Sequence, residues 1–159
     1  MYVPKIFKAP SPEAVIEFIQ KYPFATLVCE VEDKLEAVHI PLTIQKLDDG
    51  LELHGHIAKA NKLAKAIEAQ KSILVVFSEP HAYISSSWYD HVNVPTWNYI
   101  AIHAHGQIEQ VDDQTMINSL KKMVDQYEEG RENRYHISDM PEDMLKACLL
   151  YTSPSPRDA

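Results

Sequence analysis

The chain of 159 residues is poor in glycine and cysteine, with four of the first and two of the second. So few glycines argue against a glycine-rich phosphate loop, and with it against a dinucleotide-binding fold. The two cysteines build no disulfide framework, and Cys29 stands in an apolar run where a buried free thiol is commonplace. We therefore expect a reducing compartment, most simply the cytoplasm.

Long apolar runs and an excess of positive charge are also missing. The sequence has no run of about eighteen apolar residues and no basic-then-apolar leader, so we expect neither a membrane span nor secretion. It carries 15 basic and 23 acidic residues, a formal net charge of −8. Because phosphate contacts need clustered lysine and arginine, we expect no binding to DNA by this chain alone.

The residues that are present fit one domain, because 45% of them are hydrophobic and the length suits a single core. Three helices are expected from caps and apolar spacing. The first runs from Pro12 to Lys21 behind Ser11. The second follows Asn61 from Lys62 to about Gln70, and the third runs from Asp112 or Asp113 to the residue before Gly130.

Strand-like runs fill most of the remaining sequence. The segments that separate the first three runs are short and rich in turn residues. Such separators favour antiparallel hairpins over crossovers. Six antiparallel strands with flanking helices predict a mostly β (α+β) fold, a small barrel whose closure removes unpaired edges. The expected strands are Phe24–Val31, Leu35–Ile44, Leu51–His56, Ile73–Phe77, Ala82–Ser87 and Trp97–Val111.

The segments Pro80–Tyr89 and Val94–Tyr99 hold both tryptophans, three tyrosines and three consecutive serines. Indole and phenol rings offer flat apolar faces with a polar edge, which suits a pocket for a planar ligand. A β-hairpin with aromatic cross-strand pairs would use many of the same residues. Both interpretations stay open on composition alone.

Four motifs stand in register along the chain: Met1–Lys5, His39–Leu42, Gly55–Asn61 and the aromatic block of residues 80–99. Together they closely resemble the PaiB-type family of FMN-binding negative transcriptional regulators. The resemblance covers most of residues 1 to 147. It implies an FMN-binding split barrel, a homodimer with FMN at the subunit interface, and a regulatory role with DNA or a protein co-regulator as a partner. Since the same barrel hosts flavin reductases and oxidases, a flavin-dependent oxidoreductase is the alternative.

The resemblance also suggests which residues hold FMN. A helix start with a cation suits the phosphate, so we expect Lys59, Asn61 and Lys62 there, with His56 as a further donor. Solvated surface lysines are the alternative, and many relatives have proline where this chain has Lys62. Backbone freed from a strand would meet the isoalloxazine at His39, Pro41 and Leu42. Further lining candidates are Ser85, Ser86, Ser87, Trp88, Trp97 and Tyr99.

Two pairs of histidines raise a metal hypothesis. His54 and His56, and likewise His103 and His105, stand two residues apart and would share one face of a strand. Metal sites in enzymes usually require a third protein ligand, and no carboxylate stands at an obvious position near either pair. We therefore predict ordinary strand histidines and no bound metal.

The segment Cys148–Asp158 does not continue the pattern before it. Back-translation of these residues reproduces a widely used sequencing adapter, so we expect adapter read-through from residue 148 onward and a native domain in residues 1–147. A disordered Ser/Pro tail is the alternative. If a final native strand is missing, one sheet edge is expected to be left open.

Overall fold

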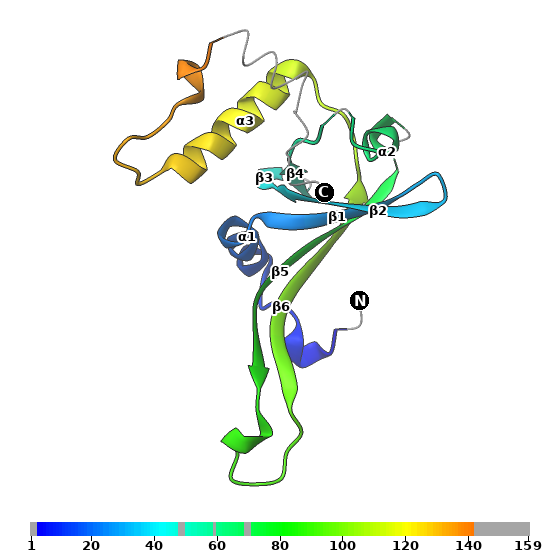
Figure 1. The fold of residues 1–159 in the computed structure, drawn as a ribbon, viewed down its shortest axis with the longest axis vertical. Helices are drawn as coiled ribbons and strands as arrows, with labels where there is room; N and C mark the ends of the chain where they lie inside the picture. Colours follow the sequence, from blue (N-terminus) through cyan, green and yellow to red (C-terminus); the bar gives the residue numbers. More distant parts are fainter. Residues whose placement is uncertain (1–2, 48–49, 59, 69–70, 142–159) are drawn as a thin grey trace.

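A computed structural model describes residues 3–47, 50–58, 60–68 and 71–141, so the expected adapter tail lies outside the described residues. Figure 1 shows a body of sheets and helices from which one long hairpin projects. In chain order the elements are η1 (Lys5–Phe7), α1 (Pro12–Lys21), β1 (Phe24–Val31), β2 (Lys34–Pro41), β3 (Thr43–Leu47), β4 (Gly50–His54), α2 (Ala64–Glu68), β5 (Ser72–Ile84), η2 (Ser86–Trp88), β6 (Thr96–Gln107), α3 (Asp113–Glu128) and η3 (Ile137–Asp139).

All strand pairs described are antiparallel, as expected, but the strands form two sheets. One sheet has the order β2-β1-β5-β6 and the other pairs β3 with β4. The two-residue turn between β1 and β2 has positive φ at Glu32 (52°) and Asp33 (61°), as the tight turn of a twisted hairpin requires. The fold is thus mostly antiparallel β with flanking helices, while a single closed six-stranded barrel is not what the described ladders form.

The expected strand Leu35–Ile44 is wrong in one respect, because the chain leaves the first sheet at Leu42. Pro41 ends β2 opposite Phe24 and has no N–H to continue a ladder. The Leu42 N–H donates instead to the Pro23 carbonyl at 2.9 Å. From Thr43 the chain pairs with β4, so one apolar run becomes two strands in different sheets.

Where two separate strands were expected, at Ile73–Phe77 and Ala82–Ser87, the chain forms one strand, β5. Ser78 lies opposite Ala101 and His81 lies opposite Tyr99, so three steps on β5 match two on β6. This is a β-bulge, and it carries the strand through the polar residues that suggested a break. The strand ends at Ile84, and β6 ends at Gln107 rather than at Val111.

The predictions of the first and the third helix are confirmed. The Ser11 hydroxyl caps α1 by accepting from the Ala14 N–H, and the Asp112 carboxylate caps α3 by accepting from the Thr115 N–H. Gly130 follows α3 with φ at +80°, where glycine is favoured. The middle helix is shorter than expected: α2 spans only Ala64–Glu68. No helix of the described residues is long and apolar enough to cross a membrane.

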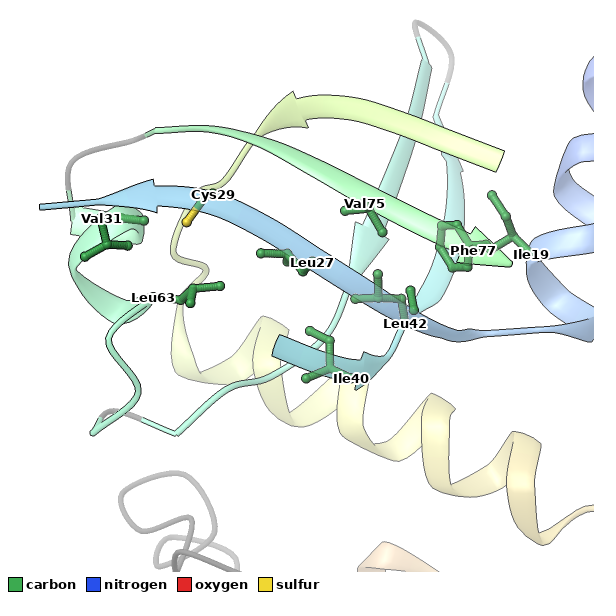
Figure 2. Close-up of a cluster of buried hydrophobic side chains, with 11 residues drawn as sticks. Ile19, Leu27, Cys29, Val31, Ile40, Leu42, Leu63, Val75 and Phe77 are labelled. Atoms are coloured by element: carbon green, nitrogen blue, oxygen red, sulfur yellow. The ribbon is translucent and has the colours of Figure 1, made fainter. Parts of the chain in front are cut away.

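The core lies between the inner face of the four-stranded sheet and the helices. Along β1 the buried positions alternate, which turns every second side chain inward. Figure 2 shows these side chains meeting residues from α1, β2, β5 and the turn just before α2. The buried cluster comprises Ile19, Ala25, Leu27, Cys29, Val31, Ile40, Leu42, Leu63, Ala66, Val75 and Phe77.

Candidate functional site

Two of the motifs meet in the body of the protein through Gly55. A Cβ atom on Gly55 would lie 2.5 Å from Leu42 Cδ2 and 3.2 Å from the Pro41 carbonyl oxygen. A side chain at this position would push the Leu42 side chain and the Pro41 carbonyl out of place, so glycine suits this approach. The motif His39–Leu42 at the end of β2 therefore lies against the segment that follows β4.

His56, the next residue, carries an unsatisfied polar atom. Its Nδ1 is buried and has no hydrogen-bond partner among the described residues. Burial lowers the pKa of His56, because the protein interior disfavours the charged imidazolium. A buried polar atom without a partner is rare in folded proteins and calls for a ligand or an ordered water. His56 is therefore held toward its neutral form and has one ring nitrogen that no described residue satisfies.

His54 and His56 do not form the expected pair on one strand face, because β4 ends at His54. The His54 ring is already engaged: its Nε2 lies 2.9 Å from Glu52 Oε2, and Gln45 Nε2 lies 3.4 Å from its Nδ1. Within the described ranges, no group of three or more His, Cys, Asp or Glu residues could hold a metal ion.

The expected phosphate residues lie in the turn before α2, and two of the three are described. Asn61 Oδ1 accepts from the Leu63 N–H at 2.9 Å, so it caps the turn as predicted. Lys62 Nζ donates to Glu36 Oε1 at 2.8 Å, and this hydrogen bond raises the pKa of Lys62. Lys59 lies outside the described residues. A five-residue helix has a weak dipole, so the cation and His56 matter more than the helix start.

Two further lysines beside Lys62 are paired in the same way. Lys65 pairs with Glu32 and Lys71 with Glu30, which links the α2 region to the β1–β2 hairpin. Exposed pairs of this kind exchange partners readily. Lys62 can therefore leave Glu36 for a bound anion.

The remaining candidates lie on the arm, defined here as residues 79–100 at the distal half of the β5–β6 hairpin (Figure 1). Tyr83 lies directly opposite Trp97, and their ring centroids are 5.8 Å apart. The His81 ring lies 6.0 Å from the same indole. The aromatic block is thus a hairpin with cross-strand ring pairs, yet Trp97 stays 59% exposed and Tyr99 64%.

The three serines have a local structural role at the tip of the arm. Ser85 Oγ accepts from the Ser87 N–H at 3.2 Å and lies 2.8 Å from Ser87 Oγ. These bonds shape η2, in which Ser86 also lies. Trp88 closes this turn and is 69% exposed.

A hollow of about 410 Å³ lies at the root of the arm, on the outer side of the sheet. It brings His39 together with residues that sequence reasoning missed. Its lining includes Tyr22, Phe24, Thr26, His39, Val76 and Ser78. The alternation of β1 could have identified Phe24 and Thr26, since they occupy the positions between the buried ones.

The candidates therefore divide into two groups. His56, Asn61 and Lys62 belong to the body. His56 follows Gly55, which lies against the end of β2 where the Leu42 side chain is buried and Pro41 is half-buried, whereas Lys62 lies beside Glu36 near the start of β2. Ser85, Ser86, Ser87, Trp88, Trp97 and Tyr99 belong to the arm, which points away from α2 (Figure 1). One copy of the chain does not bring the two groups together.

Comparison with solved structures identifies the fold. The chain resembles the FAD and heme binding protein from Mycobacterium smegmatis with a TM-score of 0.64 and 18% identity, covering 87% of this chain and 63% of that one. It resembles the flavocytochrome Anf3 from Azotobacter vinelandii with a TM-score of 0.67 and 19% identity, covering 92% and 65%. At these identities the likeness shows a shared fold.

Sequence relatives are closer. The chain is 41% identical over 133 residues to the Protease synthase and sporulation protein PAI 2 of Bacillus subtilis, covering 84% of this chain and 64% of that protein. An uncharacterized protein of Saccharomyces cerevisiae is 37% identical over 103 residues, covering 60% of this chain and 61% of its own length. The chain thus spans a little under two thirds of the length of these relatives.

A family model described as "Putative FMN-binding domain" matches residues 1–151, nearly the whole chain. This match agrees with the PaiB-type motifs and with the identity to the Bacillus protein. The chain therefore belongs to the PaiB-type family of FMN-binding domains.

Proposed function

We propose that this protein binds FMN in a homodimer and acts as a regulator of the PaiB type. The observation that carries the proposal is the unsatisfied Nδ1 of His56, at the segment that Gly55 packs against the end of β2. The family match supplies the class of ligand, because its description names FMN.

The residues present fit the phosphate end of FMN. With its proton on Nδ1, His56 donates to a phosphate oxygen, and Lys62 contributes a cation when it exchanges Glu36 for the ligand. Asn61 keeps its side-chain NH₂ for the same anion while its Oδ1 holds the turn. Lys59 remains a candidate from the sequence motif.

The isoalloxazine would lie along the end of β2, where the backbone at His39 and Pro41 borders the sheet edge. A flavin bound there would supply one- or two-electron redox chemistry. The chain itself binds and orients the ring and excludes water from it. The Leu42 backbone N–H is already taken by Pro23, so it is not one of the donors.

The homodimer part of the proposal rests on the division of the candidates. The arm holds both tryptophans, and it lies away from His56 and Lys62 within one copy. A second copy can supply an arm as the aromatic wall of the site. In this homodimer we expect the four-stranded sheet and the β3–β4 sheet of each copy to act as the two halves of one split barrel.

The regulatory role is carried over from the family resemblance, supported by the 41% identity to the Bacillus sporulation protein. The cytoplasmic location stays the expectation drawn from the few cysteines. A net charge of −8 and lysines paired with glutamates favour action through a partner or through few DNA contacts. Rapid bleaching by a reduced nicotinamide and reoxidation by a substrate would support the oxidoreductase alternative. Retardation of a specific promoter fragment at physiological salt would support the regulator.

The phosphate site is tested by calorimetry with FMN and with riboflavin, which lacks the phosphate. We expect His56→Ala to weaken FMN binding by roughly tenfold, the loss of one charge-assisted hydrogen bond, and to leave riboflavin binding nearly unchanged. His54→Ala is the matched control, since His54 is satisfied by Glu52 and Gln45. Equal loss for both ligands, or no FMN binding by the unaltered protein, would contradict the proposal.

A further inference from the structure

Glu36 stands on the side of β2 that faces the core. Residues directly opposite each other in an antiparallel pair point to the same side of the sheet. Glu36 lies opposite Cys29, which is buried in the core. The following residues of β2 on this side are Val38 and Ile40, which pack in or against the core cluster. A carboxylate in this row is unusual, because a partly desolvated charge is costly unless a partner neutralises it.

The side chain of Glu36 is also less exposed than the other carboxylates that pair with lysines of the α2 region. It is 28% exposed, against 70% for Glu32 and 57% for Glu30. Its partner among the described residues is Lys62, whose Nζ lies 2.8 Å from Glu36 Oε1. The Lys62 side chain itself is exposed. The pair therefore joins a carboxylate fixed by the sheet to an ammonium that is open to solvent and to a ligand.

The ammonium that Glu36 holds is the cation of the proposed phosphate site. The hydrogen bond to Glu36 raises the pKa of Lys62 and so favours its charged form. A carboxylate and a phosphate are both anionic acceptors for this one ammonium. A phosphate that takes Lys62 leaves Glu36 as a partly buried anion without its cation, which is unfavourable. Binding of the phosphate thus has to offset the loss of the pair.

We propose that Glu36 is an internal competitor of the flavin phosphate: it holds Lys62 in the flavin-free protein and lowers the affinity for FMN, so that bound flavin exchanges with free flavin. This inference rests on the proposed function and names the residue that regulates its site. The apparent affinity of a ligand falls with the fraction of protein in which the binding group is free. Exchangeable flavin suits a regulator, because the empty and the loaded protein then both occur.

The first test compares glutamine variants of two glutamates by calorimetry with FMN and with riboflavin. We expect Glu36→Gln to tighten FMN binding by roughly fivefold, with slower release of FMN, and to leave riboflavin binding unchanged. Glu32→Gln is the matched control, because Glu32 pairs with Lys65, outside the proposed phosphate site. We expect less than about twofold change for it. An FMN affinity that is unchanged or weaker in Glu36→Gln, or an equal gain in Glu32→Gln, would overturn the inference.

A double-mutant cycle shows whether Glu36 acts through Lys62. In a Lys62→Gln background we expect Glu36→Gln to change FMN affinity by less than about twofold, because the ammonium for which it competes is gone. A structural role of Glu36, or repulsion of the phosphate independent of Lys62, predicts the same change in both backgrounds. That result would overturn the inference.

A further measurement uses the unaltered protein. Its glutamates are labelled with ¹³C, and the side-chain carboxyl resonances are assigned by through-bond correlation to the backbone. We expect FMN to shift the resonance of Glu36 and riboflavin to leave it in place, while the resonance of Glu32 moves with neither. FMN binding that leaves the Glu36 resonance unchanged, or equal shifts with FMN and riboflavin, would overturn the inference.

The two proposals fail separately, because inorganic phosphate serves as a probe without the flavin ring. It should bind more tightly to Glu36→Gln and shift the Glu36 resonance of the unaltered protein. A protein that does this and binds no FMN would end the proposed function and leave Glu36 as a competitor for phosphate. A protein that binds FMN without disturbing Glu36 would end this inference and leave the proposed function standing.

Discussion

The strands β5 and β6 run through both the body and the arm, and their side chains have different surroundings in the two regions. In the body, β5 places Val75 and Phe77 in the core, at 2% and 0% exposure. In the arm, the same strand places Tyr83 at 47% exposure opposite an exposed Trp97. Folding of one copy accounts for the body, whereas the arm makes sense as a surface that other molecules cover.

The largest effect expected from this contrast is on stability. Phe77→Ala should lower the free energy of unfolding by about 3–5 kcal/mol, because it removes a fully buried ring and leaves a cavity. Trp88→Ala, at the exposed tip of the arm, should change it by less than about 0.5 kcal/mol in the monomer. Urea denaturation at low protein concentration measures both. Equal losses would mean that the arm is part of the folded core.

A second prediction concerns the contact between the two motifs of the body. Gly55→Ala should cost about 1–3 kcal/mol and weaken FMN binding, since its Cβ would clash with Leu42 and Pro41. Gly106→Ala, on β6 with nothing within 4 Å of the added atom, should be close to neutral. Denaturation and calorimetry report the two effects. A Gly55→Ala protein with unchanged stability would show that the motifs are not packed as described.

A third prediction uses pH to separate the body from the arm. The folded state lowers the pKa of His56, so below the usual value near 6.5 the unfolded chain binds more protons and stability falls as pH decreases. Replacing His56 with glutamine should flatten this loss between about pH 6.5 and 5. Trp88→Ala, which changes an exposed residue of the arm and no titratable group, should keep the pH profile of the unaltered protein. Urea midpoints measured across this range decide between them.

The smallest effect is expected from the paired lysines of the body. Lys62→Gln should weaken FMN binding by a few-fold, while Lys65→Gln, an exposed lysine also paired with a hairpin glutamate, should leave it nearly unchanged. Neither should alter unfolding measurably, because both pairs are exposed. Titration at two salt concentrations checks the assignment: similar affinities of the two variants would remove Lys62 from the phosphate site.

Local signals explain which parts of the fold could be predicted from the sequence. The first helix, expected at about Pro12–Lys21, and the strand Phe24–Val31 are confirmed, because a cap, a proline and strict alternation define them locally. The break at Leu42 depends on a hydrogen bond to Pro23, and the bulge after Ser78 depends on pairing with β6. Neither partner is close in sequence, so periodicity alone could not reveal them.

The candidate site shows the same limit. The sequence motifs pointed to His56 and Asn61, but the contact that brings Gly55 to Leu42 joins segments that flank strands of different sheets. The separation of the tryptophans from the body is also a property of three-dimensional arrangement (Figure 1). The sequence motifs thus identify the candidate residues as a single set. Only the structure shows that these residues lie in two separate places.

The account is tested most directly by sedimentation velocity of the full chain with added FMN, followed at a flavin absorbance wavelength. We predict that the flavin signal sediments with a dimer and that Tyr83→Glu moves both protein and flavin out of that boundary. Flavin that sediments with a monomer, or a protein boundary without any flavin, would contradict it.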